Sequence, residues 1–309
     1  MVREQRKSSP WISLLVIFLA VMFIGLFMVS CISMVSGPSS IPLGGNVAMI
    51  ELEGDIVPSS GNSIFSAGMS SDDVIELIKQ ANENPSVKAI LIRINSPGGT
   101  PVASEEIANA VKKSNKTTVA LIRDQGTSGA YWVASAADVI VASPVSITGS
   151  IGVIGSSLEF SGFMQKYGIG YERLIAGEYK DIGIPFRNLT PQERSIMQER
   201  LDLIHEHFIK SVAENRNLSM NKTREIANGL FYTGSQAYDL GLVDYLGGEE
   251  EAINAIKMKT GLTDVVLSPY KKQRGFFDIF GQVSAYNSFA MGRGIGREML
   301  DLNSQLVRT

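Results

Sequence analysis

Apolar, strand-like runs alternate with helical segments through the middle of this chain, and this alternation constrains the fold more than any other feature. Strands are predicted at 88–95, 118–122 and 139–142, where Ile, Leu, Val and Ala predominate. Helices are predicted between them, at 100–113 and 130–137. Strands that alternate with helices in this way are typical of βαβ units, whose strands are parallel. We therefore predict an α/β fold with a largely parallel sheet.

Similar patterns predict further elements on both sides of this region. Thr190 and Glu193 match a capping box, which predicts the start of a long helix with apolar positions along one face. Glycines at every third position of 148–155 predict a strand that another backbone or a ligand approaches closely. The other expected elements are strands at 47–53 and 171–175 and helices at 72–81, 221–228, 232–240 and 248–259.

The N-terminal segment has the length and composition of a membrane anchor. Residues 11–35 contain no charged side chain, and a helix of roughly 20 apolar residues crosses a bilayer. Arg3, Arg6 and Lys7 precede this segment, which is expected to keep the first residues in the cytoplasm and to place the rest outside. The alternatives are a lipoprotein with Cys31 in its cleavage box and a secreted protein with a cleaved signal peptide. In all three cases the main domain is exported.

These features divide the chain into a basic cytoplasmic N-terminus at 1–10, the anchor at 11–35, a linker at 36–46, a folded domain at 47–268 and a C-terminal tail at 269–309. The net charge of −3 gives no reason to expect a nucleic-acid partner. The single cysteine, Cys31, lies in the anchor, so no disulfide framework, cysteine nucleophile or Cys/His zinc cluster is expected in the domain. We expect neither a metal nor a cofactor.

Ser128 is the strongest candidate for a catalytic residue. It lies in a glycine-containing turn between a predicted strand and a predicted helix, where a side chain is exposed at a helix N-terminus and free N–H groups favour negative charge. A serine hydroxyl needs a base before it can act as a nucleophile. The two histidines, His205 and His207, are both expected on the surface or partly buried on the long helix. Lys180 is therefore the better candidate base, and Ser150 can orient its neutral amine.

Each of these residues also has an ordinary structural interpretation. Serines in glycine-rich turns usually cap helices, and a lysine base needs burial that lowers its pKa by about three units. Residues 96–99 (Ser-Pro-Gly-Gly) follow a strand, and they are either an ordinary turn or an oxyanion hole, because glycine lets a backbone N–H approach a substrate. The catalytic interpretation depends on the occurrence of all these elements together, in this order.

The order of the motifs resembles that of a known family, the signal peptide peptidase A enzymes, which are Ser–Lys peptidases related to the Clp protease and crotonase folds. The resemblance extends from about 47 to 264. The matching stretches are INSPGG (94–99), TSGAYWVASAAD (127–138), TGSIGVIG (148–155), GEYKDIGIP (177–185) and FYTGSQAYDLGLVDYLGG (231–248). Several motifs at matching spacing are far more specific than any one of them.

The resemblance implies a Clp protease/crotonase-like fold and a serine endopeptidase that works through an acyl-enzyme. Ser128 would be the nucleophile, Lys180 the general base and Ser150 the residue that orients the lysine. The backbone N–H groups of Gly99 and Gly129 would form the oxyanion hole. Extended peptides would add as a strand beside 96–99 and 149–155, so the implied substrate-binding residues are Ser96, Pro97, Gly98, Gly149, Ile151 and Gly152.

The family also implies partners. Its substrates are remnant signal peptides and other apolar peptides released from membranes. Its shorter members form homo-oligomers, octameric rings in which the serine and the lysine of one site come from different copies. We therefore expect peptide substrates, a membrane contact through the anchor and a homo-oligomer.

Three alternatives stay open. The first is a related membrane-bound Ser–Lys peptidase that cuts membrane proteins, such as those that work with stomatin-like proteins; the sequence after residue 35 offers no second apolar span. The second is a crotonase-like module that binds acyl-CoA, which the expected anchor disfavours because CoA is cytoplasmic. The third is a scaffold that binds peptides without cutting them, which the presence of both Ser128 and Lys180 disfavours.

Overall fold

The structure is a computed structural model that describes residues 11, 18–27, 44–59 and 69–272. Two compact units are distinguished, one formed by 1–43 with 272–309 and the other by Gly44–Lys271. The second unit contains the sheet and all the candidate site residues.

A parallel sheet forms the centre of this unit. Its main path runs β10-β1-β4-β5-β6-β9, and every neighbouring pair along this path is parallel. The strands are β1 (Val47–Glu53), β4 (Ala89–Ser96), β5 (Thr117–Thr127), β6 (Val139–Ala142), β9 (Tyr245–Leu246) and β10 (Leu267–Tyr270). The predicted α/β fold with a largely parallel sheet is therefore confirmed, whereas β9 and β10 were not predicted.

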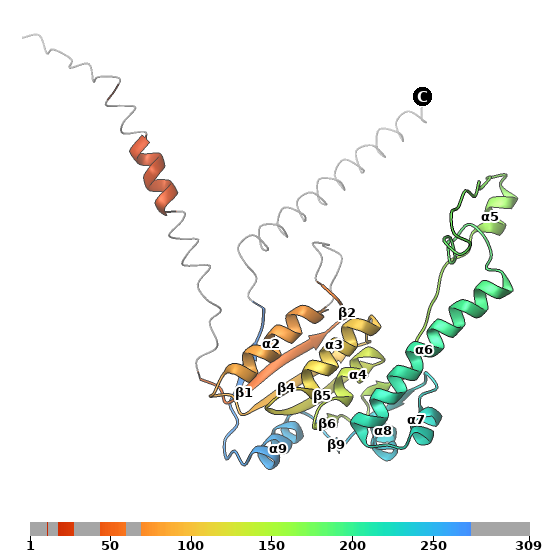
Figure 1. Cartoon of the computed structure of the whole chain (residues 1–309). Coiled ribbons are helices and arrows are strands. Elements are labelled where there is room, and N and C mark those ends of the chain that lie inside the picture. Colours follow the sequence, from red (N-terminus) through yellow and green to blue (C-terminus); the bar gives the residue numbers. More distant parts are fainter. Residues whose placement is uncertain (1–10, 12–17, 28–43, 60–68, 273–309) are drawn as a thin grey trace, which may run out of the picture. The chain divides into compact units, whose positions relative to one another are not determined.

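Helices cover both faces of the sheet (Figure 1). On β4, Ile90 and Ile92 point into one core and Leu91 points into the other, as expected for a strand whose side chains alternate between two buried faces. The first core is closed by α2 (Ser71–Glu83), α3 (Pro101–Lys112) and α4 (Gly129–Ser135), and the second by α9 (Glu249–Thr260).

Four short strands complete the described part of the unit, and two of them, β7 and β8, extend the main sheet. β7 (Ile147–Gly149) pairs in parallel with β5 and antiparallel with β8 (Phe231–Thr233), while β2 (Ile56–Val57) and β3 (Met69–Ser70) form a separate parallel pair. The strand predicted at 148–155 ends at Gly149, because Ser150 adopts a φ of 49°, outside the β region. The strand predicted at 171–175 does not form, and these residues are exposed.

One segment projects from the body of the unit, and we call residues 155–203 the arm. It comprises α5 (Ser161–Lys166) and the first half of α6 (Pro191–Arg216), which begins with the predicted capping box. α6 has 26 residues and is therefore about 39 Å long. Its second half buries Phe208 and Val212 against the body, next to α7 (Met220–Ile226) and α8 (Gly234–Leu240), whereas most of its first half is exposed.

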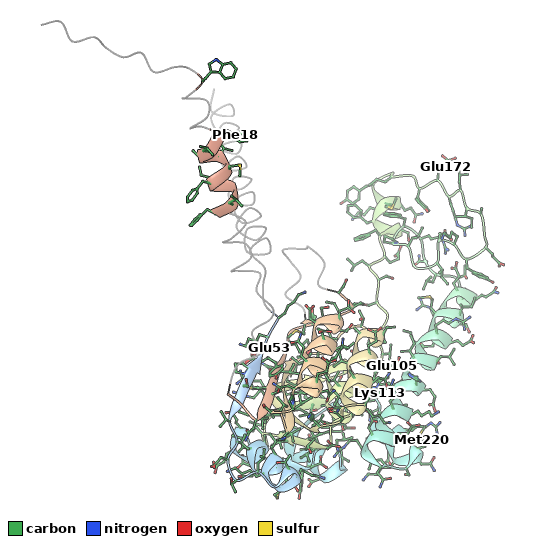
Figure 2. The ribbon with its side chains drawn as sticks, turned by 60° about the vertical axis from the view of Figure 1, so that its left-hand side comes forward. Phe18, Glu53, Glu105, Lys113, Glu172 and Met220 are labelled. Carbon is green, nitrogen blue, oxygen red and sulfur yellow. The ribbon has the colours of Figure 1, made fainter. Side chains whose placement is uncertain are left out.

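Figure 1 shows α5 near the outer end of α6. In Figure 2 the labelled Glu172 lies at this outer end, away from Glu105 and Lys113 on the body.

The first unit, formed by 1–43 with 272–309, is described only in part. Residues 18–27 are helical and exposed, and most of the predicted anchor at 11–35 lies outside the described residues. Among the residues that the structure describes, no helix has both the length and the apolar character that a membrane span needs. Most of the tail at 269–309 also lies outside the described residues.

Candidate active site

Three neighbouring strands bring the candidate site together at their carboxyl ends. Because parallel strands end at the same edge of a sheet, the segments that follow β4, β5 and β7 meet there. Ser96 of β4 lies opposite Gly126 of β5, and Thr127 of β5 lies opposite Gly149 of β7. The next residues on each strand therefore converge, and they include Ser128.

Ser128 occupies a sharp turn between β5 and α4. Its φ of 53° and ψ of −125° are unusual for a residue with a side chain, and such strain persists only where neighbouring contacts enforce it. The N–H of Ser128 donates to the carbonyl oxygen of Gly149 at 2.8 Å, and the N–H of Trp132 donates to the Ser128 carbonyl at 3.0 Å. The Ser128 hydroxyl makes no capping hydrogen bond with α4. The turn is thus fixed while the hydroxyl is left available to a ligand.

The N–H groups of Gly99 and Gly129 lie side by side next to this serine. A Cβ placed on Gly129 would be 3.2 Å from the Gly99 nitrogen, and one placed on Gly98 would be 2.7 Å from the Gly129 nitrogen. Ile56 fixes the loop, because its N–H donates to Gly98 and its carbonyl accepts from Thr100, both at 2.9 Å. No hydrogen bond from either glycine N–H to another described residue is present. Two such donors can stabilise a tetrahedral oxyanion.

A pocket of about 500 Å³ opens at this point. Ser128, Gly99 and Gly129 lie at its wall, and apolar side chains form much of the rest. The full lining is Pro97, Gly99, Pro101, Ser128, Gly129, Trp132, Ser150, Gly152, Val153, Ile154, His205, Phe208, Asn228 and Gly229. No group of His, Cys, Asp or Glu side chains among the described residues could hold a metal ion. The surroundings suit an extended, apolar ligand.

Ser150 and His205 are two polar residues that line this pocket together with Ser128. Ser150 donates its hydroxyl to the carbonyl oxygen of Gly229 at 3.2 Å, and its strained backbone (φ 49°) is held by an N–H donated to Leu230 at 2.9 Å. His205 Nε2 lies 3.2 Å from the carbonyl oxygen of Ile151. Either side chain can form a hydrogen bond with a substrate or with a neutral amine that enters the pocket.

The position of His205 was not anticipated. Both histidines are predicted to be helix-surface or partly buried residues, and His207 does lie on the outside, 2.7 Å from Glu105. His205 precedes the buried Phe208 by three residues, so the two share one face of α6. That spacing was the available signal, although it identifies a pocket residue only once the surface that α6 packs against is known.

Several expected substrate-binding residues have structural roles instead. Ser96 is fully buried, and its hydroxyl donates to the Gly54 carbonyl at 2.6 Å and accepts from the Gly98 N–H at 3.1 Å. Ile151 is fully buried in the main core. Gly149 lies in β7, whose two edges are already paired with β5 and β8, so a peptide cannot add as a strand there. Of the six expected residues, Pro97 and Gly152 line the pocket.

Lys180 does not reach Ser128 within one chain. It lies in a turn on the arm, is exposed, and is absent from the pocket lining. The adjacent Tyr179 accepts a hydrogen bond from Gln192 at 2.7 Å, which places this turn beside the start of α6. Gln192 and Phe208 are 16 residues apart on that helix, which corresponds to about 24 Å. A lysine side chain is far too short to span that distance.

Comparisons with known proteins identify relatives of this chain. A family profile described as peptidase family S49 matches residues 110–263. A Methanocaldococcus jannaschii protein named as a protease is 38% identical over 226 residues, 72% of this chain and 71% of the relative. An Enterococcus faecium protein named as a signal peptide peptidase SppA is 31% identical over 229 residues, 73% of this chain and 67% of the relative.

Two further proteins were matched, one by sequence and one by structure. A Synechocystis protein named as a protease is 36% identical over 208 residues, 67% of this chain and 71% of the relative. Among solved structures, a mutant of a membrane-bound stomatin-specific protease aligns with 75% of this chain and 100% of its own, at a TM-score of 0.46 and 14% identity.

Proposed function

Because this chain belongs to peptidase family S49 and is a serine peptidase, we propose that it cleaves peptides with Ser128 as the nucleophile and Lys180 as the general base. The observation that carries this proposal is the pocket in which the Ser128 hydroxyl, the N–H groups of Gly99 and Gly129, and Ser150 meet. This arrangement provides a nucleophile beside two oxyanion donors.

The proposed reaction proceeds through an acyl-enzyme. The neutral amine of Lys180 takes the proton from the Ser128 hydroxyl, whose oxygen attacks the peptide carbonyl carbon. Gly99 and Gly129 stabilise the resulting oxyanion, and the protonated lysine gives its proton to the amine that leaves. A water molecule, deprotonated by Lys180, then attacks the ester and releases the acid. Ser150 orients the lysine amine by accepting or donating a hydrogen bond.

We further propose that the lysine of each site is supplied by a second copy of the chain. The turn that carries Lys180 lies beside Gln192, about 24 Å along α6 from Phe208 in the pocket wall, so a site within one chain is incomplete. The arm also exposes large apolar side chains, among them Leu174 (87% exposed) and Phe163 (58% exposed), which favour association with another surface. A closed ring, octameric as in the shorter family members, would give every copy one serine neighbour and one lysine neighbour.

The proposed substrates are extended apolar peptides, such as cleaved signal peptides. The pocket wall formed by Trp132, Val153 and Phe208 suits apolar side chains, and the Enterococcus faecium relative is named for this substrate. We also propose that residues 11–35 anchor the chain in the cell membrane with the N-terminus in the cytoplasm and the peptidase domain outside, because the uncharged stretch follows basic residues.

A second candidate for the base is His205, because it lies in the same pocket as Ser128 within one chain. Its ring nitrogen is 3.2 Å from the carbonyl of Ile151, and a histidine is the usual partner of a serine nucleophile. This alternative would need no second copy. It predicts that His205→Ala abolishes cleavage whereas Lys180→Ala does not.

The test compares the full-length chain in detergent with three variants, Ser128→Ala, Lys180→Ala and His205→Ala. Cleavage of a fluorogenic apolar peptide is measured at mildly alkaline pH, with circular dichroism and sedimentation as controls for folding and assembly. The proposal expects no turnover from the first two variants and retained turnover from the third. Normal cleavage by Ser128→Ala or Lys180→Ala contradicts the dyad, and a folded, assembled but inactive wild type favours a peptide-binding scaffold.

A further inference from the structure

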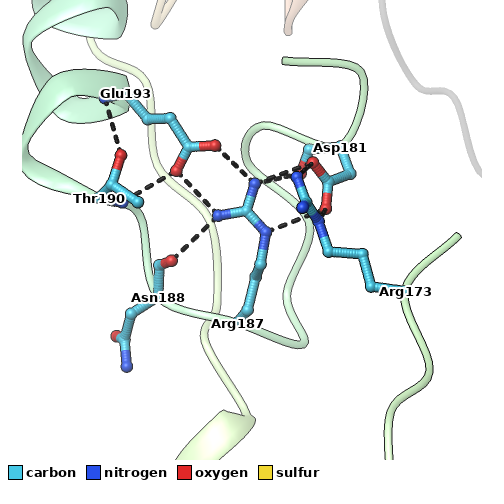
Figure 3. Close-up of polar contacts among 6 residues, drawn as sticks. All are labelled: Arg173, Asp181, Arg187, Asn188, Thr190 and Glu193. Atoms are coloured by element: carbon cyan, nitrogen blue, oxygen red, sulfur yellow. Dashed lines mark hydrogen bonds and ion pairs between the residues drawn. The ribbon is translucent and has the colours of Figure 1, made fainter. Parts of the chain in front are cut away.

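Four charged side chains form a compact cluster beside Lys180. We call Arg173, Asp181, Arg187 and Glu193 the ion cluster; Figure 3 shows their contacts. Asp181 is 7% exposed and Glu193 is 4% exposed, although most of the arm around them is exposed. Carboxylates are almost never fully buried unless they are paired. The buried position of these two therefore depends on the arginines.

Asp181 is held from two directions. Arg173 donates from Nε and Nη2 at 2.6 and 2.8 Å, and Arg187 donates from Nε and Nη2 at 3.0 and 2.9 Å. These bonds hold the pKa of the Asp181 carboxyl far below its usual range. The paired donors of each guanidinium fix both the position and the plane of the carboxylate, which a single lysine contact would not do.

Arg187 links Asp181 to the start of α6. Its Nη1 and Nη2 donate to Glu193 at 2.8 and 2.6 Å, while Glu193 also accepts from the Thr190 N–H at 2.9 Å as part of the capping box. Arg187 and Thr190 together lower the pKa of Glu193 to about 2. One guanidinium thus joins the residue after Lys180 to a helix end whose geometry is already fixed.

The side chains on both sides of Lys180 have partners on the arm, whereas the Lys180 amine has none among the described residues. Tyr179, before it, accepts a hydrogen bond from Gln192, and Asp181, after it, lies in the ion cluster. Main-chain bonds from Lys180 to Gly177 at 3.1 Å and from Ile182 to Tyr179 at 3.2 Å close the turn. The Lys180 amine itself has no hydrogen bond or ion pair with the residues that the structure describes.

We infer that Arg187 and Asp181 are positioning residues that hold the turn at 177–184 against α6 and so present the free amine of Lys180 to the active site it serves. This inference rests on the proposed function, in which Lys180 is the base. A buried ion pair is weak evidence for stability, because desolvation of the charges offsets most of the attraction. Fixing a catalytic group in place is the more consistent role, since a misplacement of about 1 Å can cost about 100-fold in rate.

The experiment uses the full-length chain with Arg187→Ala and Asp181→Asn, and with Arg200→Ala as a matched control. Arg200 is an exposed arginine of α6 whose described partner is the adjacent Glu199. Peptide cleavage gives kcat and KM, hydrogen exchange reports the amides of 177–184, and sedimentation reports assembly. Lys180→Ala is measured in parallel.

For Arg187→Ala and Asp181→Asn we expect kcat to fall by about 100-fold with KM within twofold, because substrate binding is intact while the base is misplaced. Exchange in the turn at 177–184 should accelerate at least tenfold, while exchange in the buried half of α6 is unchanged. The Arg200→Ala control should match wild type in all measurements.

The outcomes separate this inference from the proposed function. If Lys180→Ala cleaves normally, Lys180 is not the base and the dyad itself is wrong. If Lys180→Ala is inactive but the two cluster variants keep wild-type kcat or wild-type exchange at 177–184, the dyad stands and the positioning role is overturned. If both cluster variants fail to assemble, the cluster serves the fold of the arm and the positioning role is likewise overturned.

Discussion

Mixing two inactive variants should restore peptidase activity. Ser128→Ala copies keep Lys180, and Lys180→Ala copies keep Ser128. Within one chain the turn that carries Lys180 lies beside Gln192, about 24 Å along α6 from Phe208 in the pocket wall, so a chain cannot complete its own site in this conformation. In a ring, each site takes its serine from one copy and its lysine from the next. A competent site therefore forms wherever a Lys180→Ala copy receives the arm of a Ser128→Ala copy.

The expected activity follows from counting neighbours. In an assembly made from equal amounts of the two variants, half of the serines and half of the lysines are intact, so about a quarter of the sites are competent. If both residues came from the same chain, no site would be competent. The expected specific activity is thus about a quarter of the wild-type value, against none for either variant alone.

A dilution experiment provides the matched control. Wild-type chains are mixed with equal amounts of a chain carrying both Ser128→Ala and Lys180→Ala. Sites shared between copies predict about a quarter of the undiluted activity, whereas sites within single chains predict about a half. Both mixtures are made by co-expressing chains with different tags, selecting assemblies that carry both tags and checking the ratio of the chains by mass spectrometry.

The result that would refute this reasoning is a mixed assembly of confirmed composition that cleaves no peptide, together with half-maximal activity in the dilution experiment. That combination would place the base on the same chain as Ser128, and His205 would be the residue to test next because it lines the same pocket.

Gly98→Ala should lower kcat by about 100-fold without unfolding the chain, because a Cβ at a φ of 105° would lie 2.7 Å from the Gly129 nitrogen and displace an oxyanion donor; unchanged kcat would contradict this. Bonds from Arg187 and Thr190 lower the pKa of Glu193 from 4.5 to about 2, so the stability they give the arm is complete above about pH 4.5 and is lost as the pH falls toward 2. Hydrogen exchange at the start of α6 should accelerate over that range, and Glu193→Gln should weaken this pH dependence without removing it, because the pKa of Asp181 in the same cluster is also lowered. Identical pH profiles for wild type and Glu193→Gln would refute the role of Glu193. Tyr131→Phe should cost about 1–3 kcal/mol in urea unfolding, because the buried hydroxyl donates to a main-chain carbonyl at 2.9 Å that would lose its partner; an unchanged free energy of unfolding would refute that role.

The elements that the sequence predicted correctly are those with strong local patterns. The apolar runs that became β4, β5 and β6 alternate with helices, and the capping box at Thr190 is present as predicted. The turn at Ser128 was also recognised, because glycines next to a serine between a strand and a helix mark a sharp turn wherever they occur. The resemblance to signal peptide peptidase A, based on several ordered motifs, is confirmed at the level of the family.

The structure differs from the predictions where the same local sequence pattern is compatible with more than one structure. Residues 148–155 look like a strand, but the positive φ of Ser150 ends the strand after Gly149. Ser96 and Ile151 occupy motif positions that suggested substrate contacts, yet both are buried and serve the fold. A motif identifies which residues matter, but burial decides whether a side chain faces the ligand or the core.

By itself, the sequence determined the α/β class, the order of its central strands and helices and the turn that carries Ser128, because these depend on residues close together in the chain. Tertiary structure alone decided that His205 faces the pocket, that Lys180 lies far from Ser128 and that Asp181 and Glu193 share one arginine. These facts depend on how a long helix is placed against the sheet and on contacts between segments distant in sequence. No local pattern encodes such distances, because the same amphipathic helix can project from the body or lie along it.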